Sequence, residues 1–443
     1  MVFSTFPPNT FLENIAIDKS GNLYVTSVLE GIIYRLDPYG HKEPYAHIDG
    51  KPAGILCLGK EEFLLNGWDA RGIPTIFLLS AAKKITPLLQ PENARFLNGM
   101  ASLDENTTLI CDSLTGSILQ YHRIQNTAEK WLQHDLLAKA NTTNDIPAAN
   151  GIKIAQNAVY VSNTDKQLFL RIPLIGNQPG EPEIILENIL LDDFAFDPDG
   201  NCYATTHIYN SVIKISPQKQ VTTIAGEADG LAGSTALAFG TTKADNYCIY
   251  VTTNGGMTLP PAGGIQNARI VKLPVRIPTP CEWAGGVAIF EKLTDVFYVK
   301  VLRDPLLEPI FNKMSPEHAK HVAYFMAETL KGPKVYTQEY GPNALHHVIA
   351  KHLGKHLTEA QRKRWVELLM ESADEVALAA DPEFRSTFAA HIEWGSRFAL
   401  MISQSDENPV TPEDHIPQWG WGEVKGPYEA VGPLFRQKPG LPS

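Results

Sequence analysis

The stretch GNLYVTSVLEGIIYRLDP, residues 21–38, holds two short β-rich segments on either side of a turn. Both segments are rich in β-branched and aromatic residues. Glycine, asparagine, aspartate and proline bound them, which is typical of antiparallel strands. The pair recurs about every 40–50 residues, six times in all. The later pairs occupy residues 61–81, 106–123, 157–173, 200–217 and 246–275.

Six self-similar β units at this spacing predict a six-bladed β-propeller. A β-sandwich is the alternative fold, but its turn signals would lie closer together and would not come in pairs. We therefore expect residues 1–275 to form one all-β propeller domain.

The pattern changes after the last β pair. Residues 276–284 are rich in proline and predict a linker, and a helical stripe follows at 287–301. Three sites predict helix starts: Ser315-Pro316-Glu317, the capping box from Thr358 to Gln361, and Asp381-Pro382. We expect an all-α domain over 285–428 and an irregular tail over 429–443.

Composition limits the classes of function. The 443 residues, 44% hydrophobic and 20% charged, are typical of a globular protein with more than one domain. The net charge of −11 argues against sequence-independent binding to nucleic acid or to an anionic membrane. No apolar run approaches the length of a spanning helix, and the N-terminus resembles no secretory signal. Five scattered cysteines favour reduced thiols, so we expect a cytoplasmic protein.

Four histidines gather in HHVIAKHLGKH, residues 346–356. His352 has apolar neighbours, so it is either a packed core residue or the ligand of a haem iron held in an apolar pocket. His346, His347 and His356 are expected at the surface or at the rim of a site, and the spacing of the four does not favour a zinc site. Tyr298, on an otherwise apolar helix, is a polar group that could face such a pocket. The residue pattern alone leaves both readings of His352 open.

A resemblance favours haem. Residues 283–428 resemble a group II truncated haemoglobin in four segments that follow the order of that family. The segments are FYVKVLRDPLLEPIF at 297–311, EHAKHVAYFMAETLKGPKVY at 317–336, HLGKHLTEAQRKRW at 352–365 and WGWGEVKGPY at 419–428.

The resemblance implies haem b and a gas-binding pocket. His352, 13 residues before Trp365, matches the proximal ligand, whereas His356 breaks that spacing. Tyr298 and Trp365 match two hydrogen-bond donors to bound O2. The remaining matches are Phe311, which packs on the haem face, and His318 and Val322 on the distal helix. Position 318 is small in many members of the family.

A second set of polar residues belongs to the propeller. Glu13, Asn98, Asn150 and Asp192 stand at equivalent places in four blades, so they are expected to meet at one end of the central channel. Two carboxylates and two amides form an oxygen-rich set suited to a divalent cation. The alternative reading is that the Asn-Gly pairs are turn residues and that the acids cap loops.

Residues 10–275 resemble the senescence-marker-protein and gluconolactonase superfamily. The resemblance implies a divalent cation (Ca²⁺, Mg²⁺, Mn²⁺ or Zn²⁺) on Glu13, Asn150 and Asp192, with a looser match at Asn98, and implies lactone hydrolysis. AANGIKI and LDDFAFDPDGNCYATT resemble a divergent branch from fungal biosynthetic pathways, whose members act as pericyclic cyclases without obvious metal chemistry. The fold transfers between such relatives, but the reaction does not.

We therefore expect a haem-binding truncated globin fused to a gluconolactonase-like propeller that acts on an unknown small organic substrate. The globin is expected to bind O2, with NO or peroxide chemistry as further options. Three alternatives stay open: a haem-based sensor whose propeller is a docking scaffold, a metal-dependent lactone hydrolase with an accessory globin, and a haem-free helical domain. Whether the chain is an enzyme, and whether its chemistry is that of a hydrolase, cyclase, dioxygenase or peroxidase, is left open.

Overall fold

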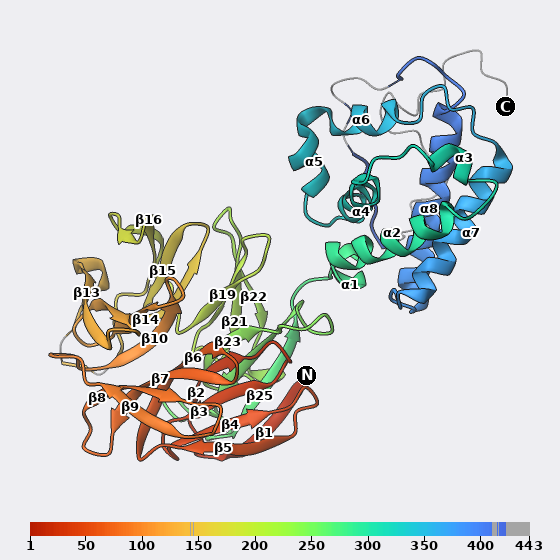
Figure 1. Cartoon of the computed structure of the whole chain (residues 1–443). Coiled ribbons are helices and arrows are strands. Elements are labelled where there is room, and N and C mark those ends of the chain that lie inside the picture. Colours follow the sequence, from red (N-terminus) through yellow and green to blue (C-terminus); the bar gives the residue numbers. More distant parts are fainter. Residues whose placement is uncertain (142, 145, 410–413, 415, 422–443) are drawn as a thin grey trace. The chain divides into compact units, whose positions relative to one another are not determined.

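The chain folds into two compact units, Met1–Arg276 and Ile277–Ser443. The computed structural model describes residues 1–141, 143–144, 146–409, 414 and 416–421 (Figure 1). Each unit is described by itself below. The predicted tail at 429–443, and residues 422–428 of the predicted globin segment, lie outside the described residues.

The first unit consists of six antiparallel sheets, which confirms the predicted six-bladed propeller. The first three blades are β2 (Leu12–Ile17), β3 (Leu23–Ser27), β4 (Ile32–Leu36) and β5 (Lys42–His47); β6 (Gly50–Gly59), β7 (Glu62–Asp69), β8 (Pro74–Leu79) and β9 (Ile85–Leu89); and β10 (Leu97–Ser102), β11 (Thr107–Asp112), β12 (Ser117–His122) and β13 (Thr127–Gln133).

The remaining blades follow in chain order, and Figure 1 shows the colours passing from red to green around the unit. They are β14 (Ala149–Ala155), β15 (Ala158–Asn163), β16 (Leu168–Ile175) and β18 (Glu183–Glu187), with β17 (Gln178–Pro179) beside β16; β19 (Phe194–Phe196), β20 (Cys202–Thr205), β21 (Val212–Ile215) and β22 (Val221–Ala225); and β23 (Ser234–Phe239), β24 (Cys248–Thr253) and β25 (Asn267–Pro274).

The N-terminal strand completes the sixth blade. β1 (Val2–Pro8) pairs antiparallel with β25, so the two ends of the propeller sequence are hydrogen-bonded to each other. The first strands of successive blades contact one another in the order β2, β6, β10, β14, β19 and β23, and β23 contacts β2 again. The ring is therefore closed, and its first strands surround the central axis.

Five of the first strands carry a register shift at the same place. In β10 the shift lies between Leu97 and Met100, and in β14 between Ala149 and Ile152. Asn98 and Asn150 are each the first residue inside the shifted segment, and Glu13 has the same position in β2. A bulge re-aims side chains locally, so these three residues are positioned equivalently in their blades.

The glycine after each of these asparagines serves close packing rather than a turn. A Cβ at Gly99 would lie 2.4 Å from the carbonyl oxygen of Asn150, and one at Gly151 would lie 2.7 Å from that of Asp192. Both distances are far below a normal contact, so only glycine lets neighbouring first strands approach this closely. Asn98 and Asn150 therefore lie within strands, and the interpretation of these Asn-Gly pairs as turn residues was wrong.

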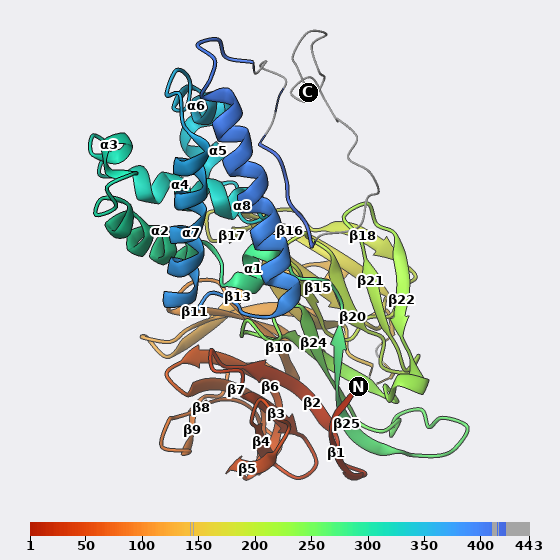
Figure 2. The same ribbon diagram turned by 90° about the vertical axis from the view of Figure 1, so that its right-hand side faces the viewer.

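The second unit is helical, which confirms the second part of the predicted fold class (Figure 2). Its helices are α1 (Pro280–Ala284), α2 (Val287–Val301), α3 (Glu308–Phe311), α4 (His318–Thr329), α5 (Val335–Tyr340), α6 (Ala344–Ala350), α7 (Glu359–Glu375) and α8 (Pro382–Ile402). Three short 3₁₀ turns complete the described secondary structure: Asp135–Leu137, Glu227–Asp229 and Gly341–Asn343.

The helical core lies where α2 packs against α4 and α7, while α7 packs against α8. Phe290, Leu293, Phe297 and Val301 of the predicted α2 stripe are buried in it. These positions recur every three or four residues and therefore share one face of the helix.

Two of the three predicted helix starts are confirmed. The Thr358 hydroxyl accepts a hydrogen bond from the Gln361 backbone N–H (3.3 Å), and Asp381 accepts one from Phe384 N–H (2.9 Å). The prediction at Ser315 was wrong. Its carbonyl oxygen, not its hydroxyl, accepts from His318 N–H (3.0 Å), and α4 starts at His318 without a side-chain cap.

The predicted linker differs from the observed chain in one respect. Residues 280–284 form α1, capped by Thr279 and Glu282, and Cys281 and Ala284 are buried in the helical core.

All five cysteines are free thiols, and four of them are buried. No helix in the described part of the chain is long and apolar enough to cross a membrane.

Candidate functional site

The first candidate site is a cluster of polar and aromatic side chains from α2, α3, α4 and α7. Tyr298 on α2 is 4% exposed, and its hydroxyl lies 3.0 Å from Nε2 of His318 at the start of α4. Phe311 at the end of α3 packs against both rings, with centroids 5.7 Å from Tyr298 and 6.0 Å from His318. Trp365 on α7 packs edge-on against Phe297, with centroids 5.1 Å apart. Four of the predicted haem-pocket residues are thus brought together.

Burial and hydrogen bonding set the protonation of Tyr298 and His318. Burial raises the pKa of Tyr298, and a hydrogen bond from Trp365 acts in the opposite direction. Burial lowers the pKa of His318 to about 4, with smaller electrostatic contributions from His352, His321 and Lys351. His318 is therefore neutral near pH 7. Because the Trp365 indole N–H can only donate, the Tyr298 hydroxyl is the acceptor toward Trp365, and it forms a second hydrogen bond with His318 Nε2.

His352 follows the end of α6 and is partly buried. Its Nδ1–H donates to the carbonyl oxygen of Val348 (2.9 Å), one helical turn earlier. This bond fixes the tautomer, so that Nε2 is the nitrogen left to accept a ligand. Burial lowers the pKa of His352, which keeps the ring neutral. His352 is also one of the groups that lower the pKa of His318, so the two rings lie in the same region of the unit.

These groups fit a haem. A neutral imidazole with its Nε2 lone pair unused is the usual proximal ligand, and Tyr298, His318 and Trp365 supply polar groups within an otherwise apolar environment. Val322 is half-buried and packs against the same core cluster. The remaining histidines are arranged differently: His346 and His356 are exposed, and His347 stacks on Tyr340 with centroids 4.0 Å apart.

The second candidate site lies on the propeller axis, where the four predicted residues come from four blades. Asn98 Nδ2 donates to Asn150 Oδ1 (2.6 Å), and Asn150 Nδ2 donates to Asp192 Oδ1 (2.6 Å). The other oxygen of Asp192 lies 2.9 Å from Nδ1 of His207. Asn98, Asn150 and Asp192 are each at least 94% buried. They form one continuous hydrogen-bonded chain that ends at a histidine.

Glu13 lies beside this chain. Burial raises its pKa to about 8, with a further rise from the charge of Asp192 and a fall from that of His207. The neighbouring carboxylate of Asp193 takes no part in the chain, because Lys153 Nζ pairs with it at 2.5 Å. The axis thus concentrates carboxyl groups, and only the charge of Asp193 is balanced by a lysine.

Sequence reasoning missed His207. It lies just after β20 in a turn, and it has a positive φ of 42°. Its Nε2 lies 3.1 Å from Asn254 Nδ2 and 3.2 Å from Thr258 Oγ1, both in the loop between β24 and β25. A single histidine outside any motif carries no signal of its own, and its partners come from another blade.

The axial residues do not fit a divalent cation in this arrangement. A cation on Asp192 would compete with two hydrogen-bond donors, His207 Nδ1–H and Asn150 Nδ2–H, for the same carboxylate. Asn150 Oδ1 is likewise engaged by Asn98. Among the described residues no three histidine, cysteine, aspartate or glutamate side chains converge as metal ligands.

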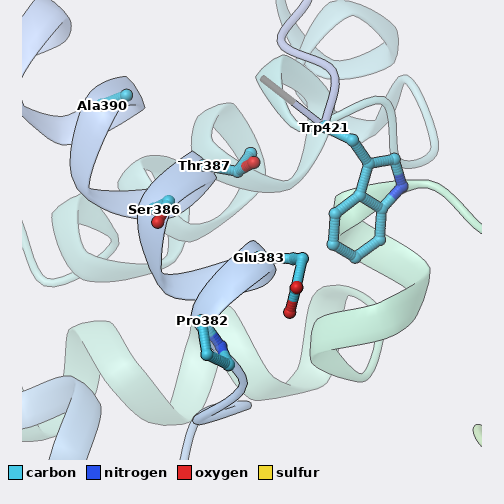
Figure 3. A pocket seen from close by; sticks show the side chains of 6 residues that line it. All are labelled: Pro382, Glu383, Ser386, Thr387, Ala390 and Trp421. Atoms are coloured by element: carbon cyan, nitrogen blue, oxygen red, sulfur yellow. The ribbon is translucent and has the colours of Figure 1, made fainter. Parts of the chain in front are cut away.

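A shallow groove of about 470 Å³ lies elsewhere on the helical unit (Figure 3). The first half of α8 lines one side of it and the Trp421 ring the other, and Figure 3 shows Glu383 and Thr387 directed toward that ring. None of the predicted site residues lines this groove.

Comparison with known proteins finds relatives of the propeller sequence. A protein from Phoma sp. provisionally named a hetero-Diels-Alderase is 25% identical in a 300-residue alignment that covers 56% of this chain and 85% of that protein.

Solved structures similar to the propeller include regucalcin from Agrobacterium tumefaciens, described as a calcium-binding protein. Its TM-score is 0.46 at 17% identity, over 62% of this chain and 97% of that one. A gluconolactonase from Xanthomonas campestris has a TM-score of 0.46 at 11% identity, over 60% and 88% of the two chains.

The helical unit also has relatives. The bacterial-like globin family matches residues 281–390. The group 2 truncated hemoglobin YjbI of Bacillus subtilis (strain 168) is 31% identical over 123 residues, which are 28% of this chain and 88% of that protein. Through its helical unit, this chain therefore belongs to the group 2 truncated haemoglobins.

Proposed function

We propose that the helical unit holds haem b through Nε2 of His352 and binds O2 or another diatomic gas beside Tyr298 and Trp365. The observation that carries the proposal is the hydrogen bond from His352 Nδ1–H to the carbonyl of Val348 (2.9 Å). It leaves Nε2 as an unprotonated nitrogen on a partly buried ring, the state that a metal ligand requires. Membership of the truncated haemoglobins supports the same assignment.

When bound, haem would supply an iron with one open position for a gas. The protein supplies the surroundings. Phe311 and Val322 offer apolar surface, and apolar surface around a haem limits the access of water. Tyr298 and Trp365 offer an O–H and an N–H, each able to donate a hydrogen bond to a polar gas such as O2.

His318 is the feature that sets this pocket apart. Its Nε2 shares a hydrogen bond with the Tyr298 hydroxyl at 3.0 Å, and its low pKa keeps it neutral. A gas that accepts a hydrogen bond from Tyr298 must compete with His318 for that hydroxyl. We expect the affinity for O2 to reflect this exchange, and a less polar gas such as CO to be less sensitive to it.

The proposal is tested by adding haem to haem-free full-length protein. We expect saturation at one haem per chain, and reduced protein that binds both CO and O2 reversibly. Binding of several haems, or none, would contradict the proposal and favour the alternative in which His352 only packs.

A further inference from the structure

The inference concerns a tyrosine, a histidine and a glutamate that lie together in the helical unit. His321 lies on α4, three residues after His318, and Glu339 and Tyr340 are the last two residues of α5. The Tyr340 hydroxyl lies 2.9 Å from His321 Nδ1, and His321 Nε2 lies 2.9 Å from Glu339 Oε1. The three side chains therefore form one continuous chain from phenol to imidazole to carboxylate.

The carboxylate sets the direction of both hydrogen bonds. An ionised carboxylate only accepts, so in the neutral His321 ring it is Nε2 that carries the proton and donates it to Glu339. Nδ1 then has a free lone pair, and the Tyr340 O–H donates to it. Burial and the charge of Glu339 raise the pKa of Tyr340, so the phenol keeps its proton near pH 7.

This arrangement favours the oxidation of Tyr340 by one electron. A phenol that loses an electron becomes a strong acid, so its oxidation is easiest where a base can take the proton at the same time. Imidazole is a stronger base than a carboxylate, with an ordinary pKa of about 6.5 against about 4.3. The imidazolium that forms on His321 is stabilised by the negative charge of Glu339, which is already in place at 2.9 Å.

Two other tyrosines show what each part of the chain contributes. The Tyr298 hydroxyl is also bonded to an imidazole, that of His318. Burial lowers the pKa of His318 to about 4, so this ring takes up a proton much less readily than an ordinary imidazole. The Tyr34 hydroxyl donates to the carboxylate of Glu30 at 3.1 Å, a weaker base than imidazole. Tyr340 combines the stronger base with the balancing charge.

Aromatic rings connect Tyr340 to the interior of the unit. Its ring centroid lies 4.6 Å from that of Tyr336, which is 4% exposed, and Phe325 on α4 packs edge-on against Tyr336 at 5.5 Å. Tyr340 itself is partly exposed, so an oxidant in solution can approach it. Rings in contact allow an electron to pass between Tyr336 and Tyr340. The oxidised state is the more stable on Tyr340, because its proton acceptor is already bonded to it.

We propose that Tyr340 is a redox-active tyrosine that donates one electron to oxidants such as peroxyl radicals, with His321 as the proton acceptor and Glu339 as the partner of the imidazolium. The electron leaves the Tyr340 ring for the oxidant, so that a peroxyl radical becomes a peroxide anion. The phenol O–H bond breaks, and an N–H bond forms at His321 Nδ1. The products on the protein are a neutral tyrosyl radical and an imidazolium paired with Glu339. An electron from a reductant such as ascorbate reverses both transfers.

This function goes beyond gas binding and needs no haem, so it is tested on haem-free full-length protein. Photogenerated tris(bipyridine)ruthenium(III) serves as the one-electron oxidant. We expect a tyrosyl radical, seen by its visible absorption band and its EPR signal, that forms more slowly in D2O because the proton moves with the electron. Tyr340→Phe should lose most of this signal.

His321→Ala tests the proton acceptor. It keeps the Tyr340 phenol but removes the base, so it should also lose most of the signal, and added imidazole should restore part of it. A merely structural role of His321 would allow no such rescue. If His321→Ala does not fold, His321→Gln serves instead, because its amide can accept the hydrogen bond but cannot take up the proton.

The matched control is Tyr34→Phe, which removes a hydroxyl bonded to a carboxylate and should leave the signal unchanged. Several results would overturn the proposal. These are a signal as strong in Tyr340→Phe as in the wild type, no tyrosyl radical in the wild type, a signal unchanged in His321→Gln, or equal rates of formation in H2O and D2O.

Discussion

Tyr298→Phe isolates the contribution of one hydroxyl group to gas binding. The substitution keeps the ring and its contacts with Phe297 (centroids 4.8 Å apart) and Phe311 (5.7 Å). It creates no cavity, because phenylalanine fills the same volume. The only group lost is the Oη that lies 3.0 Å from His318 Nε2.

The expected effect follows from the hydrogen bonds that are exchanged. Loss of a donor in a buried site costs about 1–3 kcal/mol. Here the hydroxyl gives up its hydrogen bond with His318 when it bonds to O2, so the net gain from bound O2 lies in the lower part of that range. About 1–2 kcal/mol corresponds to a roughly 5- to 30-fold faster dissociation of O2.

Stopped-flow displacement of O2 by excess CO measures this rate directly. The control is Tyr340→Phe, which removes a hydroxyl bonded at 2.9 Å to His321, the next histidine along α4. Tyr340 takes no part in the proposed pocket, so its loss should leave the rate within about twofold. An unchanged rate in Tyr298→Phe, or an equal rise in both variants, would refute the role assigned to Tyr298.

Three further predictions concern stability. Lys153→Met should destabilise the propeller in chemical denaturation, because it leaves the buried Asp193 carboxylate unpaired; the loss should lie near the lower end of about 3–5 kcal/mol. The double variant Lys153→Met, Asp193→Asn should recover most of this loss. Burial lowers the pKa of His391 to about 4, so below pH 6.5 the unfolded state binds more protons than the folded state. The His391 ring should therefore cost the helical unit about 1.4 kcal/mol of stability per pH unit as the pH falls from 6.5 toward 4. His391→Gln should remove this contribution and leave that of His318, whose pKa is also lowered to about 4, in unfolding followed by circular dichroism. Both Asp192 oxygens already accept hydrogen bonds, so Ca²⁺, Mg²⁺, Mn²⁺ and Zn²⁺ should leave the Tm of the propeller unchanged. A Tm that rises with cation concentration in the wild type but not in Asp192→Asn would contradict this account.

The number of blades could be predicted because every blade repeats the same two middle strands. The strand that completes the ring could not. β1 pairs with β25 across more than 250 residues, and nothing local to residues 2–8 indicates a partner at 267–274. Outer strands such as β22, which is exposed at four of its five residues, lack the continuous burial of middle strands such as β3 and β11.

The candidate sites could likewise be predicted only in part. Glu13, Asn98, Asn150 and Asp192 could be placed together because equivalent positions of a repeat converge on its axis. His207 could not, because its partners Asn254 and Thr258 belong to a loop of the next blade. The sequence also could not show what the four residues bind, because the hydrogen bond from His207 to Asp192 changes which ligands that carboxylate can bind.

The helical unit was more predictable where helices cap themselves. Thr358 and Asp381 start their helices through side chains three residues from their partners, a local interaction that a sequence displays. At Ser315 the chain instead forms a turn through the Ser315 carbonyl, and the start of α4 depends on packing against α2. The contact between Tyr298 and His318 likewise requires that packing.

The visible absorption spectrum of purified His352→Ala, beside that of His356→Ala, tests the central claim most directly. The two histidines lie four residues apart, but His352 is partly buried with Nδ1 bonded to Val348, whereas His356 is exposed. We predict one haem per chain and an unchanged Soret band in the wild type and in His356→Ala, and loss of haem or severely weakened binding in His352→Ala. An unchanged spectrum in His352→Ala, with loss in His356→Ala, would contradict the assignment of the haem ligand.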